Sequence, residues 1–304
     1  MTTMAIIGGG TMGADIAVAF AGARCVTHVA ETDPQRRDHL RERLHGDPIA
    51  KPGQLPVIHA TLDALPWDEI DIAIECVPES LPLKRSVFAA MERHARPDAL
   101  LTSNSSSFPI SSIAEGLATG QRMFGLHFFM PAHLVPLVEV VCGAASDAAL
   151  AQTLVQLMRT SGKVPVLVRR DLPGFLANRM QHALAREAFA LIDAGVATPE
   201  DVDAAVRFGF GFRFLAAGPV LQRDHAGLDV HCAAAATMYP TLAAGVEPAA
   251  VLRQHVARGE LGMKAGRGFY EWTPETIAAE RARYEALLRA ALELVRGDLP
   301  SGNA

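Results

Sequence analysis

The stretch MAIIGGGTMG, residues 4–13, decides the fold of this 304-residue chain. An apolar run of strand length is followed by Gly8, Gly10 and Gly13, which form a GxGxxG pattern at the start of an alanine-rich segment. In a strand–turn–helix unit the first glycine makes the tight turn, the second lets the backbone approach a pyrophosphate, and the third lets the helix pack on the strand. The pattern therefore predicts a dinucleotide-binding unit; a plain glycine turn is the alternative.

An acidic residue after the second strand would complete this unit. The pyrophosphate would lie on the amides at the start of the helix, at Thr11 and Met12. Glu31 stands 18 residues beyond the last glycine of the pattern, at the end of a second apolar stretch. A carboxylate there accepts hydrogen bonds from the adenosine ribose and repels the 2′-phosphate of NADP, so NAD is the predicted cofactor. Asp33, in the following turn, is the competing candidate.

Apolar stretches of strand length alternate with helical patterns up to about residue 170. The candidate strands are residues 4–8, 25–30, 71–75, 99–103, 122–128, 137–141 and 164–168. The candidate helices between them include residues 12–21, 35–45, 83–94 and 148–161. Strands that alternate with helices predict an α/β fold, a Rossmann-type parallel sheet covered on both faces.

The pattern of apolar residues changes near residue 171. The patterns beyond it are helical, at residues 175–194, 199–207, 226–238 and 249–257. Pro199 fits the first turn of a helix, with Thr198 as its N-cap. We therefore expect an NAD-binding domain over residues 1–171 and an all-α domain over residues 172–304.

Charge and composition exclude several classes of function. The net charge is −5 and the basic residues are scattered, so nucleic acid and membrane partners are not expected. The first basic residue is Arg24, so no signal peptide is expected, and four cysteines without a CxxC pair indicate a reducing cytoplasm. His225, His231 and Cys232 lack the usual zinc spacing, so no metal site is expected.

Five further segments share one pattern. They are residues 75–79 (ECVPE) with Lys84, 103–107 (SNSSS), 125–129 (GLHFF) with Pro131 and 137–139 (LVE), 171–179 (DLPGFLANR), and 266–270 (GRGFY). In order and spacing they resemble the 3-hydroxyacyl-CoA dehydrogenase family over nearly the whole chain. The runs ECVPE and NRMQ (178–181) are similar to the branch that includes lambda-crystallin (L-gulonate 3-dehydrogenase) and carnitine dehydrogenase.

This resemblance implies a fold, a reaction and a set of residues. The fold would be a Rossmann domain and a helical domain that mediates homodimerisation. The reaction would move a hydride between NAD and a secondary alcohol carbon of a 3-hydroxyacyl-CoA or a small hydroxy acid. The implied roles are catalysis for His127 and Glu139, substrate contact for Ser106 and Asn178, and proximity to the nicotinamide half for Glu79, Lys84, Ser106 and Lys264.

The chemistry agrees with these roles. Oxidation of an alcohol needs a base for the hydroxyl proton, and histidine can serve in both directions. Glu139 would hold the second ring nitrogen, while Ser106 and Asn178 would stabilise an alkoxide-like oxygen. The simpler alternatives are a serine turn that caps a helix near Ser111, a helix-end role for Asn178, and a solvated loop charge for Lys264.

Two departures from the family pattern concern the cofactor and the substrate. Met130 stands where the family usually has an asparagine, and a thioether cannot replace the donors of an amide. Acyl-CoA members carry a long helix–turn–helix excursion after the second strand, whereas here residues 33–69 hold one helix and a loop at 46–56. The basic residues of this segment are either CoA phosphate ligands or a solvated helix face: Arg36, Arg37, Arg41, Arg43 and Lys51.

Arg213 is a candidate substrate residue. It precedes Gly218 and Pro219 in the helical part and matches an arginine of the lambda-crystallin branch. An arginine can clamp a substrate carboxylate, and a salt bridge at the surface or at a dimer interface is the alternative. Three interpretations therefore stay open: a hydroxyacyl-CoA dehydrogenase, a dehydrogenase of a free sugar acid, carnitine or aromatic hydroxy acid, and a non-catalytic NAD-binding protein.

Overall fold

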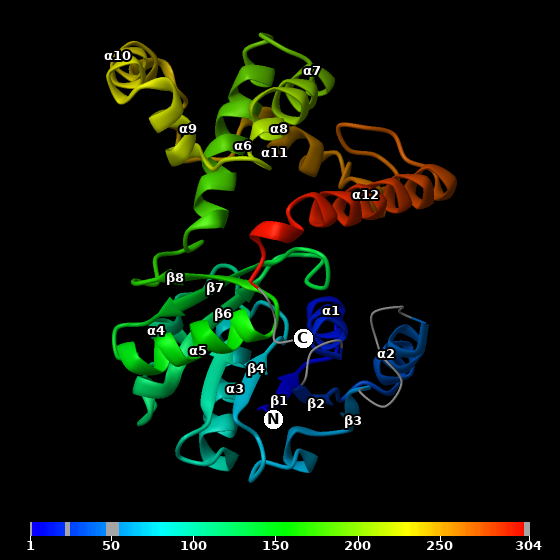
Figure 1. The fold of residues 1–304 in the computed structure, drawn as a ribbon. Helices are drawn as coiled ribbons and strands as arrows, with labels where there is room; N and C mark the ends of the chain where they lie inside the picture. Colours follow the sequence, from blue (N-terminus) through cyan, green and yellow to red (C-terminus); the bar gives the residue numbers. More distant parts are fainter. Residues whose placement is uncertain (1, 22–24, 47–54, 301–304) are drawn as a thin grey trace. The chain divides into compact units, whose positions relative to one another are not determined.

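The chain divides into two compact units. The computed structural model describes residues 2–21, 25–46 and 55–300 (Figure 1). Unit 1 comprises Met1–Arg179 and Arg296–Ala304, and unit 2 comprises Met180–Val295. Among the described residues, no helix has both the length and the apolar character needed to cross a membrane.

One eight-stranded sheet forms the centre of unit 1, in the order β3-β2-β1-β4-β5-β6-β7-β8. Its strands are β1 (Thr2–Ile7), β2 (Cys25–Ala30), β3 (Val57–His59), β4 (Ile72–Glu75), β5 (Leu100–Ser103), β6 (Met123–Phe128), β7 (Leu137–Cys142) and β8 (Val164–Val168). All neighbouring pairs are parallel except β6 and β7. The strand order reverses at β1, between β2 and β4, and ligands of such sheets bind at the carboxyl ends of the strands at this point.

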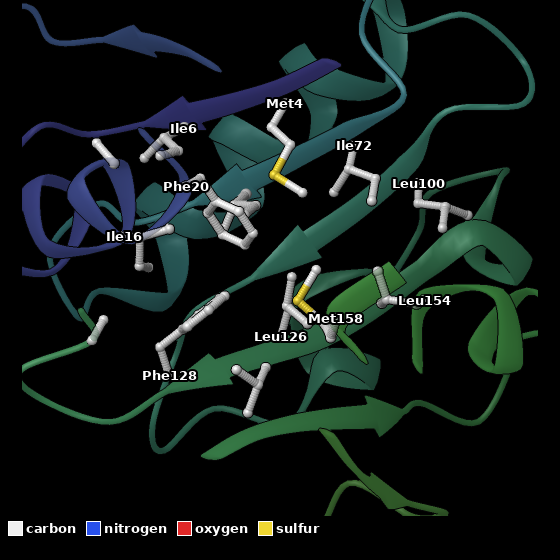
Figure 2. Close-up of a cluster of buried hydrophobic side chains, with 14 of the residues drawn as sticks. Met4, Ile6, Ile16, Phe20, Ile72, Leu100, Leu126, Phe128, Leu154 and Met158 are labelled. Atoms are coloured by element: carbon white, nitrogen blue, oxygen red, sulfur yellow. The ribbon is translucent and has the colours of Figure 1, made fainter. Parts of the chain in front are cut away.

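Helices cover both faces of the sheet through two apolar layers. One layer involves α1 (Thr11–Ala21), α2 (Pro34–Gly46) and α5 (Ala148–Thr160), and the other involves α3 (Leu81–His94) and α4 (Ile110–Ile113). Figure 2 shows the first layer, where Phe20 of α1, Phe128 of β6 and Met158 of α5 belong to one buried cluster. Each large apolar side chain buried in this way contributes about 1.5–3 kcal/mol.

Unit 2 is helical. Its helices are α6 (Ala177–Asp193), α7 (Pro199–Ala205), α8 (Gly211–Arg213), α9 (Pro219–Ala226), α10 (Leu228–Met238), α11 (Ala250–Ala257) and α12 (Pro274–Leu294), and the division from unit 1 falls inside α6. Short helical turns lie in unit 2 at Val206–Phe210, Tyr239–Thr241 and Met263–Ala265. Those of unit 1 lie at Leu62–Ala64, Gly120–Arg122 and Arg296–Asp298. The predicted cap of α7 is confirmed, because the Thr198 hydroxyl accepts from the Asp201 amide at 3.2 Å.

The predicted fold class is confirmed, and the strand direction is confirmed for every pair but β6 and β7. Only eight residues, 129–136, join these two strands, and a parallel crossover needs a dozen or more. The sequence patterns did not single out β3, α8, α9 or α12. β3 is a three-residue edge strand, and α12 begins with a capping box between Thr273 and Thr276, which lacks the Glu or Gln of the usual sequence signature. Arg24, Lys51 and most of the loop at 46–56 lie outside the described residues.

Lys163 is a buried cation beside the connection between β6 and β7. Lys163 is only 7% exposed. The ammonium group donates to the carbonyl oxygens of Ala132, at 2.5 Å, and Val135, at 3.4 Å. Burial lowers the pKa of Lys163 to about 8, although the charge of Asp15 opposes the shift. The folded chain therefore loses this proton at a lower pH than the unfolded chain does.

This shift predicts a pH dependence of stability. Below about pH 8 the folded state holds a charged lysine in the interior, and between pH 8 and 10.5 the unfolded state binds the proton that the folded state has released. The free energy of unfolding should therefore rise with pH in this window. Relative to Lys163→Met, the wild type should gain roughly 2–3 kcal/mol between pH 7 and 10 in urea unfolding. A difference that stays constant with pH would contradict the burial of a charged Lys163.

Candidate functional site

The glycine loop between β1 and α1 depends on the absence of side chains. Gly8 has φ +105°, and a Cβ there would lie 2.8 Å from the carbonyl oxygen of Cys76. A Cβ on Gly13 would lie 1.8 Å from the carbonyl oxygen of Gly8. A Cβ on Gly10 would meet nothing within 4 Å, so the backbone is open there. Gly8 and Gly13 thus serve packing, and Gly10 leaves room for a ligand.

A cavity of about 810 Å³ lies over this loop. Residues 8–12 and Glu31 line it from one side, and residues 76–78 line it from the end of β4. Its position is the point where the strand order of the sheet reverses. The glycine loop, the unpaired amides expected in the first turn of α1 and a carboxylate at the end of β2 together fit a dinucleotide.

Glu31 is the acidic residue that faces the cavity. It is 5% exposed, and its carboxylate accepts from the Gly9 amide at 2.8 Å and the Asp33 amide at 2.9 Å. The competing candidate, Asp33, caps α2 by accepting from the amides of Gln35 and Arg36. The structure therefore favours Glu31 over Asp33 as the residue positioned for a ribose.

The antiparallel register of β6 and β7 places His127 directly opposite Glu139. His127 Nδ1 lies 2.7 Å from Glu139 Oε2, and the two residues are 4% and 0% exposed. The other oxygen of Glu139 accepts from the amides of Leu176, at 3.0 Å, and Ala177, at 2.8 Å. These amides open α6, where the helix dipole also favours a negative charge.

The protonation of this pair follows from its surroundings. Burial raises the pKa of Glu139, but the bonds from His127, Ala177 and Leu176 outweigh it and hold the pKa below its ordinary value. A charged carboxylate only accepts hydrogen bonds, so Nδ1 of His127 must donate to it. In the neutral imidazole, Nε2 is then the free acceptor, as a general base requires.

A strained turn aims the two amides at Glu139. Gly174 has φ +75° and Phe175 has φ +49°, which is a left-handed conformation that bulky residues rarely adopt. Such a residue costs about 1–3 kcal/mol and persists only where its surroundings enforce it. Phe175 is 4% exposed, and its ring centroid lies 5.6 Å from that of His127, while the ring of Phe129 lies 4.6 Å away. The two rings cover the imidazole.

A buried ion pair lies at the end of β4. The Lys84 ammonium is 2.9 and 3.1 Å from the two oxygens of Glu75, and the side chains are 1% and 0% exposed. Lys84 also donates to the carbonyl oxygen of Val77 at 3.2 Å and lies 3.2 Å from Glu79. An ammonium has three donors, so all of them have partners within the protein. Sequence reasoning missed Glu75, although it begins the ECVPE run.

Glu79 connects this pair to the serine turn. One carboxylate oxygen accepts from the hydroxyls of Ser105 and Ser107, both at 2.6 Å. Burial raises the pKa of Glu79, but these hydroxyls and Lys84 outweigh it and lower the pKa. Ser106, between the two serines, is exposed, and its hydroxyl makes no hydrogen bond among the described residues. The turn thus leaves the Ser106 hydroxyl available. The serine run does not supply a side-chain cap for α4, which begins at Ile110 without one.

Comparisons with known proteins assign the chain to a family. Residues 3–172 match the model of the 3-hydroxyacyl-CoA dehydrogenase NAD binding domain, and residues 174–272 match the model of the C-terminal domain. The chain belongs to the 3-hydroxyacyl-CoA dehydrogenase family. As a member, it is an NAD-dependent dehydrogenase that acts on a CH–OH group.

Individual relatives differ in how closely they match this dehydrogenase. The 5-formyl-3-hydroxy-2-methylpyridine 4-carboxylate 5-dehydrogenase of Mesorhizobium japonicum is 31% identical in an alignment that covers 95% of this chain and 98% of the relative. A crystal structure of an enzyme with this activity, described as an NAD⁺-dependent dismutase, matches with a TM-score of 0.89 at 28% identity, over 98% and 99% of the two chains. The (S)-3-hydroxybutyryl-CoA dehydrogenase of Ralstonia eutropha matches with a TM-score of 0.71 at 27% identity, over 90% and 99%.

The predicted site residues of this dehydrogenase fall in both units. His127, Glu139, Ser106 and Asn178 belong to unit 1, and Asn178 is the second residue of α6. Arg213 ends α8 and Lys264 lies in the turn Met263–Ala265, both in unit 2. Met130, at the position of the usual family asparagine, is 61% exposed. The roles of all these residues stay predictions.

The buried pair of Glu75 and Lys84 predicts strong coupling between two substitutions. Removing one partner leaves an uncompensated buried charge, so Glu75→Gln or Lys84→Met should each cost about 3–5 kcal/mol. The double variant should cost much less than the sum, because neither charge remains. Urea unfolding of the four proteins measures this coupling.

An exposed pair serves as the control. Glu280→Gln, which breaks the surface pair with Arg283, should leave the midpoint of unfolding almost unchanged. Additive costs for Glu75→Gln and Lys84→Met would show that the two residues do not act as one pair.

Proposed function

We propose that this dehydrogenase transfers a hydride between NAD and the CH–OH carbon of a carboxylate-bearing substrate without CoA, with His127 as acid and base. The hydrogen bond between His127 and Glu139 carries the proposal. A pure NAD-binding protein has no use for a buried imidazole whose Nδ1 is held by a charged carboxylate and whose Nε2 is a free acceptor.

Residues of the chain transfer the proton of the reaction. NAD, which the glycine loop and Glu31 would hold, would supply the hydride acceptor. His127 Nε2 takes the hydroxyl proton as the C–H bond breaks, and the positive charge that forms on the imidazole is stabilised by Glu139, at 2.7 Å from Nδ1. In the reverse direction the imidazolium returns the proton to the carbonyl oxygen. Phe129 and Phe175 cover the ring and limit the access of water.

Ser106 and Asn178 are the proposed donors to the reacting oxygen. The Ser106 hydroxyl is exposed and without a partner among the described residues, while Glu79 fixes the serines on both sides of it. Asn178 follows Ala177, whose backbone amide is bound to Glu139, so the backbone of Asn178 lies close to the pair. Donors in fixed positions stabilise charge that develops on oxygen in the transition state.

Two observations favour a substrate without CoA. Between β2 and β3 the described residues contain one helix, α2, and no helix–turn–helix excursion. The pyridine-carboxylate dehydrogenase matches with a TM-score of 0.89, against 0.71 for the hydroxybutyryl-CoA enzyme. By this likeness we propose a small ring compound with a carboxylate. Arg213 is exposed and has no ion pair within the described chain, so it is free to clamp that carboxylate.

The exposed apolar surface of unit 2 supports a homodimer. Among the described residues, 26 large hydrophobic residues are exposed, of which 6 lie in unit 1 and 20 in unit 2. Ala235 is the one buried hydrophobic residue that the described part of unit 2 contains. Large amounts of exposed apolar surface commonly mark an interface. A second copy of the chain is the proposed partner.

The proposed acid and base predicts the effect of removing the imidazole. His127→Ala should lower kcat by about two to four powers of ten, which is typical of general-base catalysis, and should still bind NADH. Glu139→Gln should fold and also turn over slowly. The measurement is absorbance at 340 nm for turnover, with NADH fluorescence for binding. His94→Ala, at an exposed histidine paired with Asp63, is the control and should keep its activity. Near-normal turnover of His127→Ala would exclude the role.

The proposed substrate class predicts a selective effect of Arg213. Arg213→Met should raise KM for a free acid by about two powers of ten, because a charge-assisted pair is worth a few kcal/mol, with little change in NADH binding. Arg289→Met, at an exposed pair in the same unit, is the control. Wild type and both variants are assayed with a panel of free hydroxy acids and pyridine carboxylates and with 3-hydroxybutyryl-CoA. Efficient turnover of the CoA thioester in all three proteins would exclude the proposed substrate class.

A further inference from the structure

One face of α2 brings basic residues to the cofactor cavity. Arg36, His39 and Arg43 are spaced at i, i+3 and i+7 along the helix and line the same cavity as the glycine loop. Glu31 is the acidic residue in this lining. The residues that α2 contributes to the cavity therefore carry positive charge, in a chain whose net charge is −5.

Arg43 differs from the other two because a buried acid holds it. Asp15, on the second turn of α1, is 2% exposed, and its carboxylate forms an ion pair with the guanidinium of Arg43. The same carboxylate accepts from the Ala132 amide at 3.3 Å and lies 3.6 Å from His133 Nδ1. A bare carboxylate in this position would be costly, so these partners are needed for folding. They also fix where the Arg43 guanidinium can lie.

Arg43 can donate further hydrogen bonds while it is paired with Asp15. A guanidinium has five N–H donors in a rigid fork, and Asp15 takes a bond from one terminal nitrogen. The side chain remains 28% exposed at the cavity wall. The charge of Asp15 also acts on the ammonium of Lys163, so one carboxylate serves two cations. The cluster of Asp15, Arg43 and Lys163 thus keeps a net positive charge when both cations are protonated.

We propose that Arg43 is a phosphate-binding residue of the cofactor cavity, that it donates to the pyrophosphate of NAD, and that Asp15 is its positioning residue. The amides of the first turn of α1 would hold the pyrophosphate from one side and the Arg43 fork from another. A pre-oriented guanidinium loses little rotamer freedom when it binds an anion, which favours Arg43 over a free arginine such as Arg36.

The position along α2 indicates the pyrophosphate rather than a ribose phosphate. Glu31 marks the ribose end of the cavity, and α2 begins three residues after it, at Pro34. Arg36 lies in the first turn of α2, whereas Arg43 follows two turns, or about 10 Å of helix, later. Arg43 is paired with Asp15 of α1, the helix whose N-terminal amides would hold the phosphates.

The test measures ligand binding and needs no turnover. ADP-ribose, which contains the pyrophosphate, and adenosine, which contains no phosphate, are titrated by calorimetry into wild type, Arg43→Met, Asp15→Asn and Arg36→Met. Arg43→Met should weaken ADP-ribose about 10- to 100-fold, as expected for a charge-assisted hydrogen bond, and should change adenosine binding less than about twofold. Asp15→Asn should give a smaller loss for ADP-ribose, and Arg36→Met should change it little.

Each other outcome overturns the proposal. Unchanged ADP-ribose affinity in a folded Arg43→Met would show that the ion pair with Asp15 is only structural. Equal losses for ADP-ribose and adenosine would show an effect through the fold, and thermal unfolding of each variant checks this. With 2′-phospho-ADP-ribose titrated as a third ligand, a loss restricted to it would assign Arg43 to a ribose phosphate. Since none of the three ligands reacts, the result is independent of His127 and of the proposed substrate.

Discussion

The buried carboxylate of Glu139 links the sheet of unit 1, the start of α6 and the acid–base role proposed for His127. A charge without solvent is stable only when hydrogen-bond donors surround it, and here the donors come from three places: His127 on β6 and the amides of Leu176 and Ala177. The antiparallel register of β6 and β7 supplies the first. The left-handed turn at Phe175 supplies the other two by directing the start of α6 toward the carboxylate.

The carboxyl ends of β1, β2, β4, β5 and β6 bring the remaining groups together. Glycines are required at this edge because Gly8 and Gly13 approach other backbone atoms too closely for a side chain. Beside them, Glu75 and Lys84 form a buried pair that extends through Glu79 to the serine turn. The polar groups at this edge either bind one another, and so hold the loops, or remain free to bind a ligand, as proposed for Ser106.

Local sequence patterns predicted most elements of the fold and singled out most of the candidate residues. The glycine pattern, the alternation of strands and helices, and the acid at Glu31 all depend on neighbours in sequence. Asp15 with Arg43, and Glu75 with Lys84, depend on how separate elements pack, so composition and periodicity could not reveal them. The positive φ of Phe175 is imposed by its surroundings rather than by its own preference. The direction of β7, in contrast, was already implied by the eight-residue connection from β6.

The tautomer of His127 tests the central claim most directly. Nitrogen-15 NMR of histidine-labelled protein distinguishes a protonated from an unprotonated ring nitrogen, and His127→Ala assigns the signal. The account predicts that the neutral ring carries its proton on Nδ1, bound to Glu139, and leaves Nε2 free, and that Glu139→Gln weakens this preference. A neutral His127 with its proton on Nε2 would contradict the account, because that ring could not accept a proton from a substrate hydroxyl at Nε2.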